Sequence, residues 1–384
     1  MTRIIEFLIA LGIVAVLALA VGLVLPSHRH ISESVETNRK MTIVYDTVNN
    51  LNRFKDWNPL VLRDPHMQLN VSGPAAGVGA QLDYASNEGR IGKGSWKIVE
   101  SVPNEKVVIQ VDNPQRGSDK QVQFLLEPTG KNNRNVKITQ TYDVDYGWNL
   151  LGRYAGLYVS RHVGDDVKLG LNRMTNMLAT VPNFDYRAEG VPLVDLKLVD
   201  LPAEDLLVVT AGNIERNNEA IKQSIKNNQE WIKRTMELNG LEATGPVRII
   251  TTDFGAERYA FDVAVPVRRK GAAAATPAAD AGDKDKEEAA TPVSTSPIAA
   301  QGEPLKVKIP DGAPVQYVRT EPRRAAFAAY TGYMAELDAV RNSVRAWALT
   351  HGHEVTDRPF EVWKGGVDKS FSAEGTYDVY WAIK

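Results

Sequence analysis

The sequence predicts an α+β protein with an N-terminal transmembrane helix and two globular regions built on antiparallel sheets. Three observations lead to this fold class. Residues 7–25 contain no polar side chain. Residues 30–183 carry several strand-like runs that end in one long helical period. Residues 190–384 contain the order strand, helix, strand, strand twice. Runs of strands closed by helices are typical of α+β architectures.

Length and composition limit the class of protein. A chain of 384 residues is too long for a typical single core, so two or three domains are expected. A net charge of -2 provides no field that would favour nucleic acid as a partner. The chain has no cysteine, which excludes disulfides and thiolate chemistry.

The apolar run predicts a membrane anchor over residues 1–29, because its length matches a helix that crosses the bilayer core. Pro26 ends the run. The alternative is a cleaved signal peptide, since Ala18-Leu19-Ala20 has the form of a cleavage site. We expect a single-pass protein of the bacterial inner membrane with its soluble domains in the periplasm. Basic residues after the run favour the opposite orientation.

The first globular region, residues 30–183, is expected to begin with a strand and a helix and to end with a long helix. Apolar spacing predicts the first helix over 43–54, and Trp57-Asn58-Pro59 follows its end. The closing helix, after Gly164, is predicted by an apolar face of Val167, Leu171, Met174 and Leu178. Strands are expected at 32–38, 95–99, 107–111, 121–126 and 136–142.

The segments FKDWNPL at 54–60, GVGA at 77–80 and GKGSWKIVESVPNEKV from Gly92 give this region a family resemblance. It resembles the START-like helix-grip superfamily, in particular its polyketide-cyclase and lipid-transport-like members. The resemblance implies an apolar cavity between sheet and helix that holds a hydrophobic small molecule or lipid. Trp57, Tyr84 and Trp96 are the expected ligand-binding residues. The other interpretation is that these aromatic residues only fill the core.

The second region, residues 190–384, is predicted to be one domain with a disordered insertion over 270–301. That insertion is rich in Ala, Pro, Thr and charged residues and has almost no large apolar side chain. Helices are expected around Ile221 to Met236 and around Leu337 to Trp347, and Gly240 and Gly352 end them. The strands are expected at 206–210, 247–250, 259–267, 325–330, 360–363 and 377–383.

The two halves align through FDVAVPV at 261–267 and YDVYWAI at 377–383. Asp262 falls on Asp378 and Val263 on Val379, so each copy places one acidic residue in an apolar strand. An unpaired carboxylate in such a position is unfavourable, which suggests a partner or a ligand.

The segments YTGYMAEL at 330–337, RPFEVWKG at 358–365 and YDVYWAIK at 377–384 carry a second resemblance. This region resembles the gyrase-inhibitor-like effector-binding domains, which also occur in AraC-type and MerR-type regulators. The resemblance implies a groove between the halves for a small, often cationic or aromatic molecule, with an acidic residue, usually Glu, in the last strand. Asp378 takes that position here, and its shorter side chain departs from the pattern.

A carboxylate among aromatic rings is also the combination that recognises a cation. The expected ligand-binding residues are Asp378, Tyr380, Trp363, Glu361, Tyr330 and Tyr333. The other interpretation is that Asp262 and Asp378 point to solvent and the aromatic residues are core.

No nucleotide-binding loop, nucleophile elbow or HExxH motif occurs in the sequence. We therefore expect no cofactor and no metal. The function that follows is non-catalytic binding or sensing of a hydrophobic or cationic small molecule at the membrane, without nucleic acid. The alternative is a cyclase-like or hydrolase-like enzyme acting on a small hydrophobic substrate.

Overall fold

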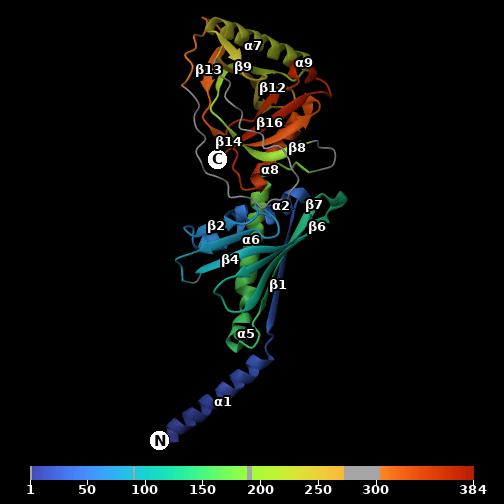
Figure 1. Ribbon diagram of the computed structural model, residues 1–384. Helices are drawn as coiled ribbons and strands as arrows, with labels where there is room; N and C mark the ends of the chain where they lie inside the picture. The colour runs from blue at the N-terminus through green and yellow to red at the C-terminus, as the bar shows by residue number, and fades with distance from the viewer. Residues whose placement is uncertain (1, 90, 188–192, 272–302) are drawn as a thin grey trace. The chain divides into compact units, whose positions relative to one another are not determined.

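The computed structural model describes residues 2–89, 91–187, 193–271 and 303–384. The chain forms two compact units, Met1–Val181 and Pro182–Lys384 (Figure 1). Both are mixtures of helices and antiparallel sheets, as expected for the α+β class. The predicted insertion over 270–301 lies, apart from its first two residues, outside the described residues.

The chain begins with a long apolar helix, α1 (Thr2–Val24). Its segment Arg3–Val24 has a mean hydropathy of 3.0 and is almost entirely exposed, so it is long and apolar enough to cross a membrane. A signal sequence has the same properties, so both interpretations of this segment stand.

The sheet of the first unit is antiparallel throughout, and its described strands run in the order β1-β7-β6-β5-β4-β3-β2. The strand β1 follows α1 directly and therefore starts at the end of the sheet nearest α1. The strand bounds are β1 His28–Thr37, β2 Gln68–Ser72, β3 Gln81–Ala85, β4 Lys93–Val102, β5 Lys106–Asp112, β6 Ser118–Thr129 and β7 Asn135–Asp145.

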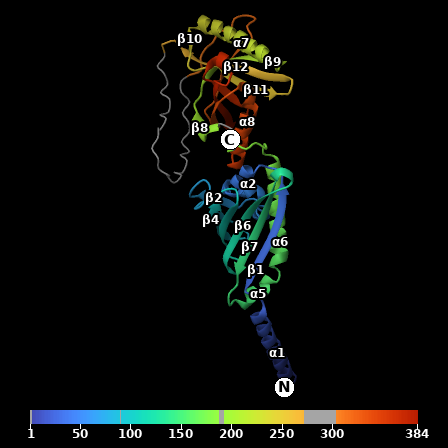
Figure 2. The ribbon, with the colours of Figure 1, turned by 90° about the vertical axis from the view of Figure 1, so that its right-hand side faces the viewer.

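The closing helix α6 (Val159–Ala179) packs against this sheet (Figure 2). Its predicted apolar face is confirmed, since Leu171, Met174 and Leu178 have no exposed surface. The helix begins before Gly164, where the sequence placed its start, and a short helix α5 (Leu150–Gly156) precedes it.

The single helix predicted over 43–54 is wrong, because the structure breaks it into pieces. Helix α2 (Met41–Val48) ends at Asn49, and the Asn50 side chain accepts a hydrogen bond from the Asn52 amide (2.8 Å). Asparagine competes for backbone hydrogen bonds in this way and interrupts helices. A 3-10 turn at Leu51–Arg53 and the short helices α3 (Phe54–Trp57) and α4 (Leu60–Arg63) follow.

The described strands of the second unit form one antiparallel sheet in the order β13-β9-β12-β11-β15-β16-β14-β8, with β10 beside β12. The order strand, helix, strand, strand occurs as β9-α7-β11-β12, with β10 between α7 and β11, and again as β14-α8-β15-β16. The strand bounds are β8 Leu193–Leu201, β9 Asp205–Glu215, β10 Leu241–Ala243, β11 Arg248–Phe254, β12 Arg258–Arg269, β13 Val315–Arg319, β14 Arg323–Thr331, β15 Phe360–Trp363 and β16 Thr376–Ile383.

The helices α7 (Asn218–Asn239) and α8 (Leu337–Thr350) supply apolar side chains to the main core of this unit, together with a short helix α9 (Gly366–Lys369). Gly240 ends α7 in the left-handed conformation that glycine favours (φ 62°), as the sequence indicated. The Asn217 side chain caps the start of α7 by accepting from the amides of Glu219 and Ala220.

The alignment of the two sequence copies is preserved in the sheet. Ile249 of β11 lies opposite Glu361 of β15, Val263 lies opposite Ile249, and Val379 lies opposite Glu361. Val263 and Val379 therefore occupy matching positions, and so do the preceding residues Asp262 and Asp378.

Candidate ligand-binding sites

The first unit contains a cavity of about 120 Å³ between its sheet and α6. Side chains from α3, α4, α6 and five strands surround it, and the residues predicted to bind a ligand in this unit all belong to its wall. The lining residues are Trp57, Asn58, Pro59, Leu60, Arg63, Tyr84, Ile91, Trp96, Val111, Asn113, Gln115, Val122, Gln140, Tyr142, Val163, Asp166, Val167 and Gly170.

The aromatic wall of this cavity is also part of the core. Trp57 packs edge to face on Trp96 (centroids 6.2 Å apart) and on Phe124 (5.7 Å), and Phe54 contacts both tryptophans. Edge-to-face pairs of this kind stabilise a core beyond the burial of their area. Trp57 and Trp96 therefore satisfy both interpretations made from the sequence, as core residues and as walls of a cavity.

Two buried polar atoms at the cavity have no hydrogen-bond partner in the structure, Trp57 Nε1 and Gln140 Oε1. The two residues are 3% and 5% exposed. A buried donor or acceptor without a partner is unfavourable by about 1–3 kcal/mol. One donor and one acceptor thus remain available on a largely apolar wall.

Charged groups of the cavity lie where it reaches the surface. Arg63 donates from Nη2 to both carboxylate oxygens of Asp166 (2.7 and 2.6 Å). Burial raises the pKa of the Asp166 carboxyl, and the Arg63 guanidinium opposes that rise. Burial also raises the pKa of the Tyr84 hydroxyl, with the Asp112 charge as the smaller cause. Tyr84 lies over Gly94, where a Cβ atom would come within 2.5 Å of its hydroxyl oxygen.

The second unit buries an ion pair at the centre of its sheet. Glu361 of β15 has no exposed surface, and Arg341 of α8 donates to it through Nε (2.5 Å). Arg341 also donates from Nη2 to the Tyr259 hydroxyl (3.2 Å), which lies beside Thr251 Oγ1 (2.9 Å). Burial raises the pKa of Tyr259 to about 12. The carboxylate is thus neutralised within the protein.

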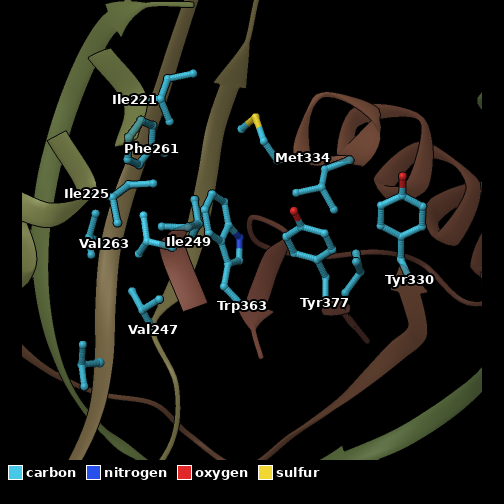
Figure 3. Packing of buried hydrophobic residues seen from close by; sticks show 14 of the residues in the cluster. Ile221, Ile225, Val247, Ile249, Phe261, Val263, Tyr330, Met334, Trp363 and Tyr377 are labelled. Atoms are coloured by element: carbon cyan, nitrogen blue, oxygen red, sulfur yellow. The ribbon is translucent and has the colours of Figure 1, made fainter. Parts of the chain in front are cut away.

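Aromatic side chains accompany Glu361 on the helix-covered face of the sheet. Tyr377 contacts Trp363 edge to face (5.7 Å, 86°) and stacks on Tyr330 (5.7 Å, 20°). Figure 3 shows Trp363 between the apolar side chains from α7 and β12 on one side and Tyr377 and Met334 on the other. The Tyr330 hydroxyl donates to Glu336 (2.7 Å), and the Tyr333 hydroxyl accepts a hydrogen bond from the side-chain amide of Asn218.

Asp378 and Tyr380 lie on the opposite face of the sheet from Glu361. The register pairs Asp378 with Val362 and Tyr380 with Phe360, whereas Glu361 faces Val379. Successive side chains of a strand point to opposite faces. The predicted ligand-binding residues of this unit are therefore divided between the two faces of the sheet and do not form one site. Tyr380 stacks on Phe360 (4.9 Å, 11°), and burial raises its pKa to about 12.

Both aligned aspartates have internal partners. Asp378 pairs with Lys364 (2.6 Å), and Asp262 accepts a hydrogen bond from Arg358 (2.8 Å). Their side chains are 19% and 10% exposed, so neither points freely to solvent. The sequence suggested a partner or a ligand for each carboxylate, and in the structure that partner is a cationic side chain of the same chain.

Replacing Asp378 by alanine is expected to reduce the free energy of unfolding by only about 1 kcal/mol or less, because its partner Lys364 is half exposed. The change would be measured by hydrogen exchange of the β16 amides in the full chain. Lys364→Ala is the control and should give a similar loss. A loss of several kcal/mol would show that the carboxylate has a further buried role.

A second cavity, of about 320 Å³, lies in this unit beside the buried pair. Arg341 and Trp381 form part of its wall, and the Arg341 Nη1 atom has no hydrogen-bond partner. The remaining wall is mostly polar, with Phe254 and Pro359 as its apolar members. The lining residues are Thr251, Thr252, Asp253, Phe254, Asp338, Arg341, Asn342, Asp357, Arg358, Pro359 and Trp381.

Sequence reasoning missed Gln140, Arg341 and Tyr259. Gln140 stands in an alternating strand, where a polar residue is expected at the surface, and no local signal marks it as buried. Arg341 lies on the apolar stripe of its helix, four residues after Leu337 and three before Val344, which was the only available hint. Among the residues that the structure describes, no group of three or more His, Asp or Glu side chains could hold a metal ion.

The fold and these sites define an α+β protein with one long apolar helix, a helix-grip-like unit that encloses a cavity, and a second antiparallel unit with a buried ion pair. No protein-family model matches the chain, and no curated protein matches it.

Comparison with solved structures gives matches at low identity and low TM-score, among them the following three. Norcoclaurine synthase from Thalictrum flavum is 14% identical, over 38% of this chain and 93% of its own, with a TM-score of 0.30. XoxI from Bacillus cereus is 11% identical, over 39% and 96%, with a TM-score of 0.29. The C-terminal domain of EcmrR is 13% identical, over 50% and 97%, with a TM-score of 0.32.

Proposed function

We propose that the chain is a membrane-anchored, non-catalytic protein that binds a small hydrophobic molecule or lipid in the cavity of its first unit. The observation that carries this proposal is the pair of unpartnered buried atoms, Trp57 Nε1 and Gln140 Oε1, on the wall of a largely apolar cavity. Nearly all buried polar groups of folded proteins are hydrogen-bonded. A bound molecule would supply the two missing partners.

The wall specifies the chemistry of the ligand. An apolar body fits the rings of Trp57, Trp96 and Tyr142, a donor on the ligand fits Gln140 Oε1, and an acceptor fits Trp57 Nε1. A cavity of about 120 Å³ is close in size to the ~150 Å³ cavities that hold benzene. One ring or the end of an alkyl chain therefore fits inside.

In this proposal α1 is retained as a single-pass anchor in a bacterial inner membrane, with both units in the periplasm. The length and hydropathy of α1 support a span. The intact mass of the protein recovered from membranes tests this: loss of the first twenty or so residues would indicate a cleaved signal peptide instead.

For the second unit we propose a gyrase-inhibitor-like effector-binding domain adapted to a neutral ligand. Glu361 is the buried carboxylate on the helix-covered face, and it is already paired with Arg341. A cationic ligand would have to displace an arginine that is 3% exposed, which leaves a buried charge without a partner. Neutral aromatic molecules meet no such penalty.

The test is native mass spectrometry of the full chain, purified gently in detergent from its own host. We expect a bound small molecule in the wild type and a roughly tenfold or greater loss of affinity in Gln140→Leu, because one buried hydrogen bond is removed. Gln121→Leu, an exposed glutamine on the neighbouring strand β6, is the matched control. Equal occupancy in both variants would contradict the proposed contact.

An enzymatic alternative uses the same cavity. Asp166 stands at its wall with a carboxyl pKa raised by burial, which suits a general acid or base. Recovery of the bound molecule in a chemically changed form after incubation, with the change abolished in Asp166→Asn, would favour an enzyme. Recovery of the unchanged molecule supports binding alone.

A further inference from the structure

The short helix α5 lies next to the point where α1 ends (Figures 1 and 2). Large apolar side chains are exposed around it. They come from α5 and its two flanks. The α5 surface consists of Trp148 (82% exposed), Leu151 (67%), Leu157 (48%) and Tyr158 (63%). Single exposed apolar residues are common, but a group of four within one short segment indicates an interaction site.

The segment that carries the α5 surface is hydrogen-bonded to the last two turns of α1. The Tyr154 hydroxyl donates to the Ala18 carbonyl (2.6 Å), and Arg153 Nη1 donates to the carbonyls of Leu23 (3.0 Å) and Leu25 (3.2 Å). The Arg153 contacts satisfy carbonyl groups that the end of a helix leaves without partners. A cation at this end also interacts favourably with the helix dipole.

Close packing joins the two helices as well. A Cβ atom on Gly22 would lie 3.2 Å from Tyr154 Cε2 and 3.4 Å from Leu150 Cβ. The glycine therefore lets α5 approach the α1 backbone. Ala18 to Leu25 covers about 10 Å along the helix axis, so α5 lies beside the final 10 Å of α1.

This geometry sets the depth of α5 once α1 spans a membrane. The final 10 Å of a spanning helix runs from the outer acyl chains to their boundary with the headgroups. Tryptophan and tyrosine are enriched at that boundary, and short amphipathic segments insert their apolar faces there by about 5–10 Å. The α5 surface has the residue types and the position that this environment requires.

We propose that the α5 surface inserts into the membrane interface and holds the first unit against the bilayer. The proposal rests on the membrane anchor of the proposed function and adds a second, peripheral contact to it. The occupant is the lipid bilayer, because the surface is continuous with the exposed apolar helix α1 through the contacts of Arg153 and Tyr154.

Docking in this way places one end of the cavity of the first unit near the lipid. Val163 and Asp166, on the first turns of α6, line the cavity, and α6 starts directly after α5. Asn113 and Gln115 line it from the β5–β6 connection. That connection lies at the α1 end of the sheet, because Ser118 and His28 both pair with Asp145.

A ligand that enters at this end comes from the bilayer rather than from bulk water. In this arrangement we expect the ligand to be a molecule that partitions into membranes, such as a lipid or a hydrophobic alcohol. An acyl-chain end or one ring matches the cavity of about 120 Å³.

The test uses single-cysteine labelling, since the chain contains no cysteine of its own. Leu151→Cys, Val99→Cys and Val14→Cys are labelled with an environment-sensitive fluorophore in the full chain, reconstituted in phosphatidylcholine vesicles. Val99 is a matched control, exposed by 38% on β4. Val14 reports on α1. Spin-labelled lipids then quench any fluorophore within the bilayer.

We expect the probe at residue 151 to be blue-shifted and to lose fluorescence to a spin label near the headgroups, while the probe at residue 99 keeps its emission. Quenching at residue 14 without quenching at residue 151 would overturn the α5 proposal and leave the anchor intact. Absence of quenching at residue 14 would overturn the anchor and the α5 proposal together. A blue shift at residue 151 without quenching would identify protein, rather than lipid, as the occupant.

Discussion

Replacing Arg341 by methionine is expected to destabilise the second unit by about 3–5 kcal/mol. The substitution leaves the Glu361 carboxylate, which has no exposed surface, without its cation. It also removes the donor to the Tyr259 hydroxyl. Hydrogen exchange of the β15 and β16 amides in the full chain would measure the loss separately from the first unit.

The loss of stability in Arg341→Met should depend on pH, because the Glu361 carboxyl binds a proton in the folded variant. Burial raises the pKa of its carboxyl above that of the unfolded chain, and Arg341 opposes the rise, so removing Arg341 raises the pKa further. The folded variant then binds a proton more tightly than the unfolded chain. Its stability increases as the pH falls through the raised pKa. We therefore expect the deficit of Arg341→Met to be largest at neutral pH and to shrink toward about pH 5.

The double variant Arg341→Met, Glu361→Leu is the control for this interpretation. It removes both charges and keeps apolar volume, and such replacements are frequently neutral or stabilising. We expect it to recover most of the stability lost in the single variant and to lose the pH dependence. A double variant as unstable as Arg341→Met would show that packing of the arginine side chain, not its charge, supports the sheet.

Replacing Phe124 by alanine is expected to destabilise the first unit by about 3–5 kcal/mol. Phe124 has no exposed surface and packs edge to face against Trp57, so its loss leaves a void next to the aromatic wall of the cavity. Hydrogen exchange of the β5, β6 and β7 amides would measure the effect, because these strands are hydrogen-bonded neighbours.

Two comparisons make the Phe124 result informative. Val99→Ala, at a half-exposed position of β4, should change stability by less than about 1 kcal/mol. The amides of the second unit should be unaffected, because the two units have separate cores. An equal loss of protection in both units would contradict the view that each unit folds around its own core. A small loss in the first unit would mean that the void collapses or fills.

The order of elements in both units could be predicted from the sequence. Apolar spacing within one helix and alternation within one strand are local properties, and Leu171, Met174 and Leu178 show them fully. The break after α2 was missed because Asn50 interrupts the helix through a hydrogen bond of its side chain that apolar periodicity does not show.

The candidate sites were predictable only in part. Trp57, Tyr84 and Trp96 were selected as strand and helix residues of a cavity-bearing fold, and they do meet at one cavity. Asp378 and Glu361 were grouped together because both are acidic and lie near aromatic residues. Their separation depends on which residues of β15 and β16 face each other, a matter of pairing between strands.

By itself the sequence determined the apolar N-terminal helix, the α+β class, the positions of most helices and strands, and the alignment of Asp262 with Asp378. Each of these depends on the spacing of residues that are close along the chain. Only the tertiary structure decided that Arg341 neutralises Glu361, that the Oε1 atom of Gln140 lacks a partner beside a cavity, and that α5 lies along the end of α1. These depend on contacts between segments far apart in sequence, which form when separate apolar faces are buried against one another.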